Sequence, residues 1–325
     1  MKRINSKLKK LLPAIQKNIS LKNYTTFKIG GPAKYFFVAT IKKDLVRAIR
    51  LAKKFNLPFF ILGGGSNLLV SDKGFSGMVI KFQMSNVKPM GSPKFAKQIW
   101  GNIQMSKLYT EAGAPLSLLV NQSIKQNLSG LEWAVGIPGT VGGAIYGNAG
   151  AFKKNISAAI KKAEILDVRN LKIKKFKKQD CKFNYRDSIF KHKKNLIILS
   201  AELQLKKGNK KEVQKKLKEC LDYRKQTQPL EFPSAGSIFK NPSPTQILKK
   251  FRRAKNFSAG ELIEKCGLKG KRTGGAKISE KHANFIVNLG GAKAKDVKKL
   301  INLAKKKVKK KFGITLAEEI QHLGF

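Results

Sequence analysis

One stretch of the chain, residues 130–151, contains no lysine or arginine, although 68 of the 325 residues are basic. A stretch of this length should contain about four or five basic residues by chance. It instead contains Pro138, Thr140 and a dense set of glycines: Gly136, Gly139, Gly142, Gly143, Gly147 and Gly150. Glycine occurs at this density where the backbone must turn with positive φ or lie directly against a bulky group. We therefore predict that this stretch lies against a ligand.

A second glycine segment, residues 63–67, reads Gly-Gly-Gly-Ser-Asn and joins two apolar runs, residues 58–62 and 68–70. The runs are typical of buried strands, and successive backbone N–H groups in such a turn can bind phosphate oxygens. The pattern matches neither the G-x-G-x-x-G dinucleotide fingerprint, because a strand is expected after it, nor the P-loop, because no Gly-Lys-Ser/Thr follows. A simple hairpin turn is the alternative. Together, the two glycine segments favour a pyrophosphate cradle.

Several classes of protein are excluded by the chain as a whole. No run approaches the roughly 18 apolar residues of a membrane span. The cysteines and histidines are few and scattered, without a Cys-x-x-Cys pair: Cys181, Cys220, Cys266, His192, His282 and His322. This usage predicts neither a disulfide framework nor a metal site. We expect a cytoplasmic protein that binds no metal and no membrane.

The net charge of +49 raises the possibility of nucleic-acid binding, because lysine and arginine neutralise phosphates. The lysines are, however, spread along the whole chain. In residues 294–310 they fill the solvent face of an expected helix whose apolar stripe consists of Ala294, Val297, Leu300, Ile301, Ala304 and Val308. We interpret the charge as compositional drift. Any binding to nucleic acid should be indifferent to sequence and lost steeply with salt.

Hydrophobic periodicity divides the chain into a basic N-terminal helix (1–20), two α/β units (21–85 and 86–222) and an α+β unit (223–325). The last boundary follows a lysine-rich helix that ends near residues 226–229. The elements expected are helices at residues 4–15, 44–54 and 116–126, and strands at 35–40, 58–62, 68–70, 163–168, 196–205, 282–288 and 314–322.

Three short segments carry polar groups suited to chemistry: residues 184–188 (Asn-Tyr-Arg-Asp-Ser), 233–242 and 313–320. In the last segment, strand alternation places Ile314, Leu316 and Ile320 on one face and Glu319 on the other. Each segment also has an ordinary explanation. Arg186 would fit a surface ion pair, Ser237 a turn and Glu319 a solvated strand face.

Taken together, six segments resemble one enzyme family. In order, these are TTFKIGGPA (25–33), LGGGSNLLVSD (62–72), IPGTVGGAIYGNAGAF (137–152), NYRDS (184–188), SAGSIFKNP (234–242) and L-x-x-E-I (316–320). Their order and types resemble the UDP-N-acetylenolpyruvoylglucosamine reductase (MurB) family over nearly the whole chain. The resemblance implies an α+β fold, in which a two-subdomain FAD-binding domain of the vanillyl-alcohol-oxidase type precedes an α+β substrate-binding domain.

The resemblance also implies an activity and a set of site residues. NADPH would reduce FAD, and the enolpyruvyl group of UDP-N-acetylglucosamine enolpyruvate would then be reduced to give UDP-N-acetylmuramate, a peptidoglycan precursor. Arg186 and Glu319 would stabilise the developing enolate, Ser237 would protonate it, and Tyr185, Lys240 and Asn241 would contact the substrate. The implied FAD contacts are Gly63, Gly64, Gly65, Ser66, Asn67, Gly136, Ile137, Pro138, Gly139, Thr140, Gly142 and Gly143.

The alternative on the same fold is an oxidase of sugar alcohols or lactones, many of which tether FAD covalently through histidine or cysteine. The first cysteine here is Cys181 and the first histidine is His192, well after both glycine segments. We therefore expect FAD to be bound non-covalently, and the protein to act as a monomer.

Two features depart from the full family pattern. Ser237 follows Arg186 by only 51 positions, which leaves no room for the tyrosine-bearing loop that some members fold over the substrate. The chain thus resembles the loop-less subclass. Glu318 precedes Glu319, so two carboxylates compete for one role, and both the alternation and the family pattern favour Glu319.

Overall fold

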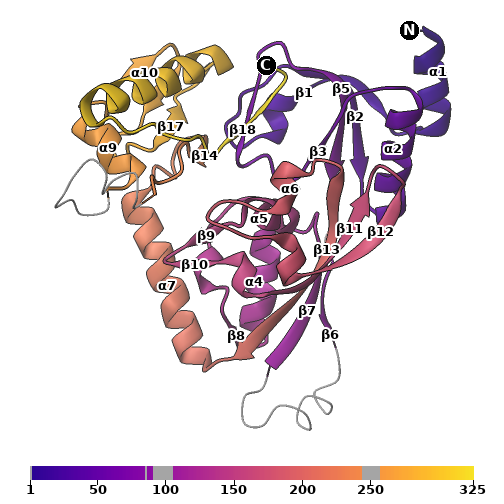
Figure 1. The fold of residues 1–325 in the computed structure, drawn as a ribbon, viewed down its shortest axis with the longest axis horizontal. Helices are drawn as coiled ribbons and strands as arrows, with labels where there is room; N and C mark the ends of the chain where they lie inside the picture. The colour runs from indigo at the N-terminus through magenta and orange to yellow at the C-terminus, as the bar shows by residue number, and fades with distance from the viewer. Residues whose placement is uncertain (1, 85, 91–104, 244–256) are drawn as a thin grey trace. The chain divides into compact units, whose positions relative to one another are not determined.

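The computed structural model describes residues 2–84, 86–90, 105–243 and 257–325 (Figure 1). The chain forms two compact units, and neither is a single continuous segment. The first unit comprises Met1–Gln16, Phe36–Gly64 and Met78–Tyr223; the second comprises Lys17–Tyr35, Gly65–Gly77 and Arg224–Phe325. The domain boundaries expected from the sequence stay a prediction.

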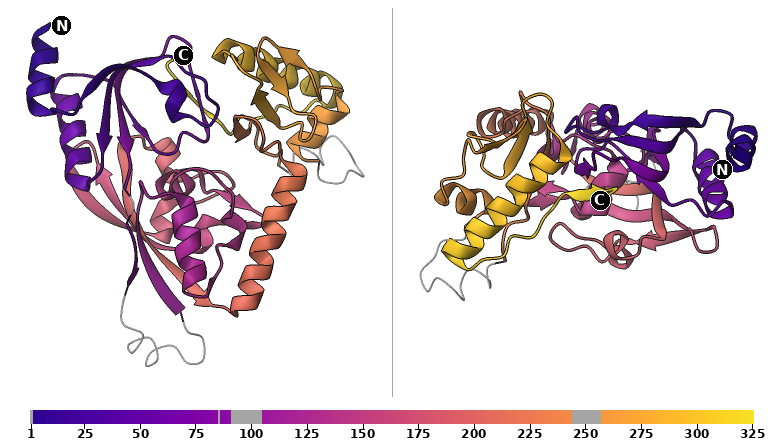
Figure 2. Two further views of the ribbon diagram at one scale, coloured as in Figure 1. Left: turned by 180° about the vertical axis from the view of Figure 1, so that it is seen from behind. Right: turned by 90° about the horizontal axis from the view of Figure 1, so that it is seen from above.

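A six-stranded antiparallel sheet dominates the first unit, in the order β12-β11-β13-β7-β6 with β8 paired to β13. Its central strand β13 is buried on both faces over its first six residues, as expected of a strand covered on both sides. The helices α4 and α5 lie against this sheet (Figure 2). The elements of this unit are α1 (Lys2–Leu11), α2 (Lys42–Lys54), β3 (Phe59–Leu62), β6 (Val87–Met90), β7 (Met105–Glu111), α4 (Leu116–Lys125), β8 (Leu128–Ser129), α5 (Val141–Gly147), β9 (Gly150–Ala151), β10 (Lys154–Asn155), β11 (Ile160–Asp167), β12 (Lys172–Lys177), α6 (Ile189–His192), β13 (Leu196–Lys207) and α7 (Lys210–Thr227), which contains the boundary.

A smaller sheet has the order β1-β2-β5-β3, with β1 at Gln16–Ser20, β2 at Pro32–Ala39 and β5 at Phe75–Phe82. Its strands β3 and β5 are parallel, with Phe59 opposite Met78 and Leu62 opposite Lys81. The carboxyl ends of the two strands therefore lie side by side. In open α/β sheets, this is the edge at which ligands bind.

In the second unit, α9 and α10 pack with a sheet of order β14-β17-β16-β15 (Figure 1). Helix α10 buries the stripe predicted from its sequence, from Ala294 to Val308, in the core of this unit. It ends at Gly313, whose φ of 67° is the left-handed conformation that favours glycine at a helix end. The elements of this unit are β4 (Leu68–Val70), β14 (Ser234–Ser237), α9 (Ala259–Lys265), β15 (Arg272–Thr273), β16 (Ala276–Ile278), β17 (Phe285–Asn288), α10 (Ala294–Phe312) and β18 (Gln321–Leu323).

The predicted strand at residues 314–322 is wrong in its extent. The structure has an extended segment after Gly313, a single bridge at Glu318 and a three-residue strand, β18. The predicted alternation does hold for burial, since Ile314, Leu316 and Ile320 are all buried. The hydrophobic pattern fixed which side chains face the core, but the backbone hydrogen bonds go to different partners along the segment.

The other predicted elements occur within three residues of their expected bounds, except at the end of the first helix. The first helix stops at Leu11, because Pro13 cannot continue it. Within the described residues, no helix combines the length and the apolar composition that a membrane crossing needs.

Candidate active site

A cavity of about 450 Å³ opens in the first unit at the carboxyl ends of β3 and β5. Its volume lies in the range typical of small-molecule and cofactor sites. Three residues predicted to contact FAD, Gly64, Gly139 and Thr140, line it. The other lining residues are Thr40, Lys81, Phe82, Gln83, Met84, Asn86, Gly113 and Pro115.

The two glycine segments meet backbone to backbone at this cavity. A Cβ on Gly64 would lie 2.5 Å from the Cα of Gly139, and one on Gly63 would lie 2.5 Å from Oγ1 of Thr140. Any side chain would force the segments apart, which explains the glycines at both positions. Such a surface offers main-chain atoms to a ligand at close range, as a diphosphate requires. The residues present therefore fit the FAD predicted from the sequence.

The rest of the predicted FAD contacts do not line this cavity: Gly63, Gly65, Ser66, Asn67, Gly136, Ile137, Pro138, Gly142 and Gly143. Some have a packing role instead. A Cβ on Gly142 would lie 2.8 Å from Cβ of Ala112, and one on Gly65 would lie 2.1 Å from the carbonyl oxygen of Tyr24. Their contact with FAD stays a prediction.

Several lining residues were missed by the sequence analysis because they come from segments without a motif. Lys81 and Phe82 end strand β5, and Gly113 and Pro115 precede helix α4. The only signal available in the sequence was the position of Lys81 at the end of an apolar run. Parallel pairing with β3, which brings Lys81 to the glycine turn, is a tertiary feature.

In the second unit, the segments that carry Ser237 and Glu319 lie side by side. The Glu319 N–H donates to the carbonyl of Ile238 at 2.8 Å, and the Lys240 N–H donates to the carbonyl of Ala317 at 2.8 Å. Ser237 is the last residue of β14 and follows Gly236, whose φ is 72°. This left-handed glycine lies inside the strand, where the register of the β14–β17 pair shifts between Ser234 and Ser237, so the turn expected before the serine is instead an irregular strand.

Asn67, predicted as an FAD contact, holds the Glu319 segment. Its side-chain amide donates to the Glu319 carbonyl at 3.1 Å, and its own carbonyl accepts from the Gln321 N–H at 2.9 Å. The parallel pairing of β18 with β4 continues this contact. The backbone of Glu319 is therefore fixed on both sides.

The neighbouring carboxylate, Glu318, is engaged elsewhere. It forms ion pairs with Lys305 of α10 and with His322, whose Nε2 lies 2.6 Å from Oε2. The hydrogen bond from His322 is the main cause that lowers the pKa of Glu318 to about 2. Glu318 is thus engaged by Lys305 and His322, and the role of Glu319 as the residue that acts on a ligand stays a prediction.

Three other residues predicted for the site, Arg186, Tyr185 and Asn241, lie in different parts of the fold. Arg186, in the first unit, is half-buried with a φ of 50°, and its Nη2 donates to the Gly150 carbonyl at 2.7 Å. Its guanidinium lies 5.5 Å from the ring of Tyr185, which is exposed. In the second unit, the Asn241 side chain accepts from the N–H of Ala259, at the start of α9.

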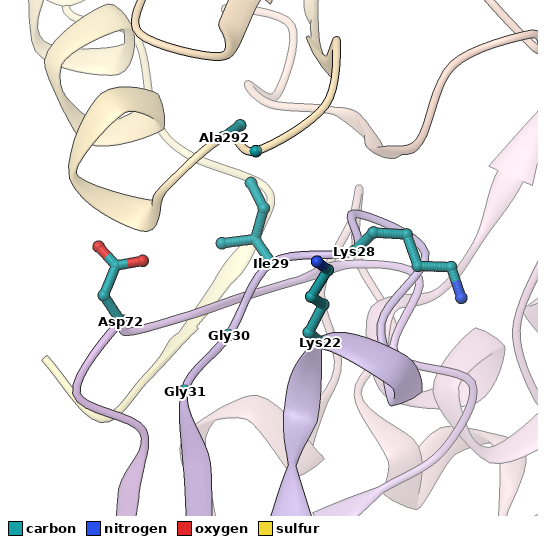
Figure 3. Close-up of a pocket in the computed structure, with 8 residues that line it drawn as sticks. Lys22, Lys28, Ile29, Gly30, Gly31, Asp72 and Ala292 are labelled. Carbon is teal, nitrogen blue, oxygen red and sulfur yellow. The ribbon is translucent and has the colours of Figure 1, made fainter.

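A smaller cavity of about 180 Å³ lies in the second unit, near the start of α10 (Figure 3). Residues of the 25–33 motif line it, and Gly31 is packed so closely that a Cβ would lie 2.2 Å from the Asp72 carbonyl. The Asp72 carboxylate already accepts from the N–H groups of Ala294 and Lys295. Gly31 is thus explained by close packing, and Asp72 by its capping of the start of α10.

Comparison with known proteins identifies the family. The FAD binding domain matches residues 33–170, and the UDP-N-acetylenolpyruvoylglucosamine reductase C-terminal domain matches residues 228–323. The reductase of that name from Caldanaerobacter subterraneus is 42% identical over 98% of this chain and 97% of its own length. The chain belongs to the UDP-N-acetylenolpyruvoylglucosamine reductase family.

Further relatives agree with this assignment. The reductase from Caldicellulosiruptor bescii is 45% identical over 95% of this chain and 90% of its own length. The crystal structure of the MurB enzyme from Thermus caldophilus superposes with a TM-score of 0.74 at 33% identity, covering 95% of this chain and all of that one. The predicted family and fold class are confirmed: the chain is an oxidoreductase with an FAD-binding domain followed by the family's C-terminal domain.

Attachment of the flavin can be predicted from the cavity. Among the described residues that line it, none is a histidine or a cysteine. We therefore expect acid precipitation of the purified protein to release all of the yellow colour into the supernatant. A protein with covalently attached flavin, treated in parallel, should keep its colour in the pellet. Colour in the pellet of this protein would refute non-covalent binding.

Proposed function

We propose that this chain reduces UDP-N-acetylglucosamine enolpyruvate to UDP-N-acetylmuramate with NADPH as the hydride donor. It would act as a monomer in the cytoplasm, in the synthesis of peptidoglycan precursors. The observation that carries the proposal is the pairing of the Ser237 and Glu319 segments, in which the Glu319 N–H donates to the carbonyl next to Ser237. A proton donor and a carboxylate are thereby held together on one framework.

The residues of this chain have distinct roles in the proposed reaction. FAD, when bound, supplies the hydride chemistry between NADPH and the enolpyruvyl double bond. Arg186 as a cation and Glu319 as a hydrogen-bonded acid stabilise the negative charge that develops on the substrate carboxylate, and such preorganised groups commonly give the largest catalytic term. The Ser237 hydroxyl donates a proton to the enol carbon. Nearby positive charge, from Lys240 or the pocket as a whole, stabilises the alkoxide that remains.

The substrate contacts follow from the chemistry of a sugar nucleotide. Lys240 suits the diphosphate or carboxylate as a charged hydrogen-bond donor. Tyr185 and Asn241 are assigned to the substrate by the family pattern, and Tyr185 has an exposed ring suited to packing on a ligand. The FAD contacts proposed are Gly64, Gly139 and Thr140 at the cavity, together with the other residues of the two glycine segments.

One assay tests the proposal as a whole. Purified protein should be yellow, and NADPH should be consumed rapidly only when the enolpyruvyl sugar nucleotide is present. Oxygen consumption that depends on a sugar alcohol or lactone and needs no NADPH would identify an oxidase of the same fold instead. A colourless protein that takes up no flavin would rule out both the reductase and the oxidase activity.

The two adjacent glutamates give a sharper test. Glu319→Gln should slow reoxidation of the reduced protein by the enolpyruvyl substrate by about 10²–10³-fold, because Glu319 acts as an acid where negative charge develops. Reduction of the flavin of this variant by NADPH should stay near the native rate. Glu318→Gln should leave both half-reactions near native, since Glu318 is paired with Lys305 and His322. Stopped-flow absorbance of the flavin measures both half-reactions.

Glu318→Gln should instead change stability, with a defined dependence on pH. The folded-state pKa of Glu318 is about 2, compared with an ordinary value of 4.5. A depressed pKa stabilises the folded state above the ordinary value, and this contribution is lost as pH falls toward the folded-state pKa. The variant should therefore be less stable than the parent at neutral pH, and the difference should shrink between about pH 4.5 and 2.

Equal reoxidation defects in both glutamate variants would contradict the assignment of Glu319.

A further inference from the structure

Among the described residues that line the 450 Å³ cavity, Lys81 is the single one with a charged side chain. It lies on β5 opposite Leu62, the last residue of β3, in the parallel pair. Four consecutive buried residues, Gly77 to Ile80, precede it. A lysine that follows such a run at the carboxyl end of a strand is placed where a ligand of the sheet would lie.

The ammonium of Lys81 is directed at the glycine turn. Its Nζ donates to the carbonyl of Gly63 at 3.2 Å, and Gly63 is followed by Gly64, which packs on Gly139. The side chain is half-buried, and this burial lowers the pKa of Lys81 from its ordinary value. Removal from water disfavours the charged form, whereas a neighbouring anion would favour it.

The backbone surface made by Gly64 and Gly139 contributes no side-chain charge. The diphosphate of a dinucleotide carries two negative charges, and an oxyanion bound in a partly buried site needs positive charge or N–H donors around it. A lysine ammonium has three N–H donors, so its bond to Gly63 is compatible with a second bond to a phosphate oxygen.

We propose that Lys81 binds the diphosphate of FAD, acting as the charged partner of the backbone cradle formed by Gly64, Gly139 and Thr140. This inference rests on the FAD-binding part of the proposed function and is independent of the substrate. The competing location for such a cation is beside the isoalloxazine ring. The two locations differ in what they change, because a charge beside the ring alters the reduction potential of the flavin, whereas a charge at the diphosphate alters affinity.

The experiment measures two properties of the holoprotein and of three variants, Lys81→Met, Lys81→Arg and Lys88→Met. Equilibrium ultrafiltration with flavin fluorescence gives the Kd for FAD, and titration against a reference dye gives the midpoint potential of the bound flavin. Lys88→Met removes the same charge from an exposed position on β6 that does not line the cavity. Lys81→Arg keeps the charge.

Lys81→Met should raise the Kd for FAD by about 10–100-fold, the loss expected of a hydrogen bond to a charged group. Its midpoint potential should equal that of the parent, Lys81→Arg should recover most of the affinity, and Lys88→Met should behave as the parent. For the case in which Lys81→Met is isolated without flavin, a fourth variant, Lys81→Gln, is added. A yellow Lys81→Arg then supports the proposal, together with a colourless Lys81→Gln whose far-ultraviolet circular dichroism matches that of the parent.

An unchanged Kd in Lys81→Met would overturn the proposal, and so would a lower midpoint potential, which would place the cation beside the ring. The proposal would also be overturned if Lys81→Arg bound FAD as weakly as Lys81→Met. A structural role for the aliphatic part of the lysine side chain would then explain the loss of affinity without any role for its charge. None of these results depends on turnover. A parent that binds FAD but fails to reduce the enolpyruvyl sugar nucleotide would refute the proposed function and leave the role of Lys81 measurable.

Discussion

Ser237→Ala should slow reoxidation by the enolpyruvyl substrate by about 10²–10⁴-fold, the contribution typical of a positioned acid. Reduction of the flavin by NADPH should proceed at near the native rate, because the proton that Ser237 donates is needed only after hydride has reached the substrate. The serine is held at the end of β14, between the left-handed Gly236 and the segment paired with Glu319. Loss of its hydroxyl should leave that backbone framework unchanged.

Stopped-flow absorbance of the two half-reactions checks this expectation. Ser234→Ala is a suitable control, since it makes the same change on the same strand. The Ser234 hydroxyl accepts a long hydrogen bond of 3.4 Å from the Gly236 N–H, so little is lost with it. The control should reduce and reoxidise like the parent. If Ser237→Ala instead slows reduction by NADPH and reoxidises normally, Ser237 belongs to the nicotinamide site and the assigned proton transfer is wrong.

Gly64→Val should abolish FAD binding. Its Cβ would lie 2.5 Å from the Cα of Gly139 and 3.1 Å from the carbonyl carbon, and these are backbone atoms that cannot rotate away. The valine would therefore separate the two glycine segments and open the cradle. The flavin content of the purified variant, measured from the ratio of visible to ultraviolet absorbance, should fall to the background level.

Gly147→Ala provides the matched control in the glycine segment at residues 130–151. A Cβ on Gly147 meets nothing within 4 Å, so this variant should keep its full flavin content. Gly64→Ala makes the smallest possible change at the critical position and should bind FAD more weakly than the parent. If Gly64→Val folds and keeps its flavin, the cradle assigned to the two glycine segments is incorrect.

The sequence was most informative where one local pattern decides the structure. The stripe from Ala294 to Val308 is buried as predicted, because a helix of this length presents one face to the core whatever its partners are. The glycines at positions 64 and 139 were recognised from their density, and the structure supplies the reason for them, which is mutual backbone packing.

Features that depend on contacts between residues far apart in the chain could not be predicted from the sequence. Lys81 in its apolar run gave no sign that parallel pairing would bring it to Gly63. The segment around Glu318 has the alternation of a strand, yet its hydrogen bonds go in turn to the Ser237 region and to Asn67. Asn67 looked like a phosphate ligand, and its contact with the Glu319 carbonyl, 252 positions away, could not be read from composition or spacing.

The contact between Asn67 and the Glu319 segment has a consequence for how the molecule is made. Strand β18 begins at Gln321 and pairs with β4, with Gln321 opposite Leu68. During synthesis, residues 65–77 must therefore wait until residue 321 has been made before the pairing that holds Glu319 can form. Closing a loop of this length is entropically costly and slow compared with helix formation. The proposed catalytic carboxylate is thus held in place only once a contact across 252 positions has formed, and a variant in which β18 cannot pair would lack the strand that fixes it.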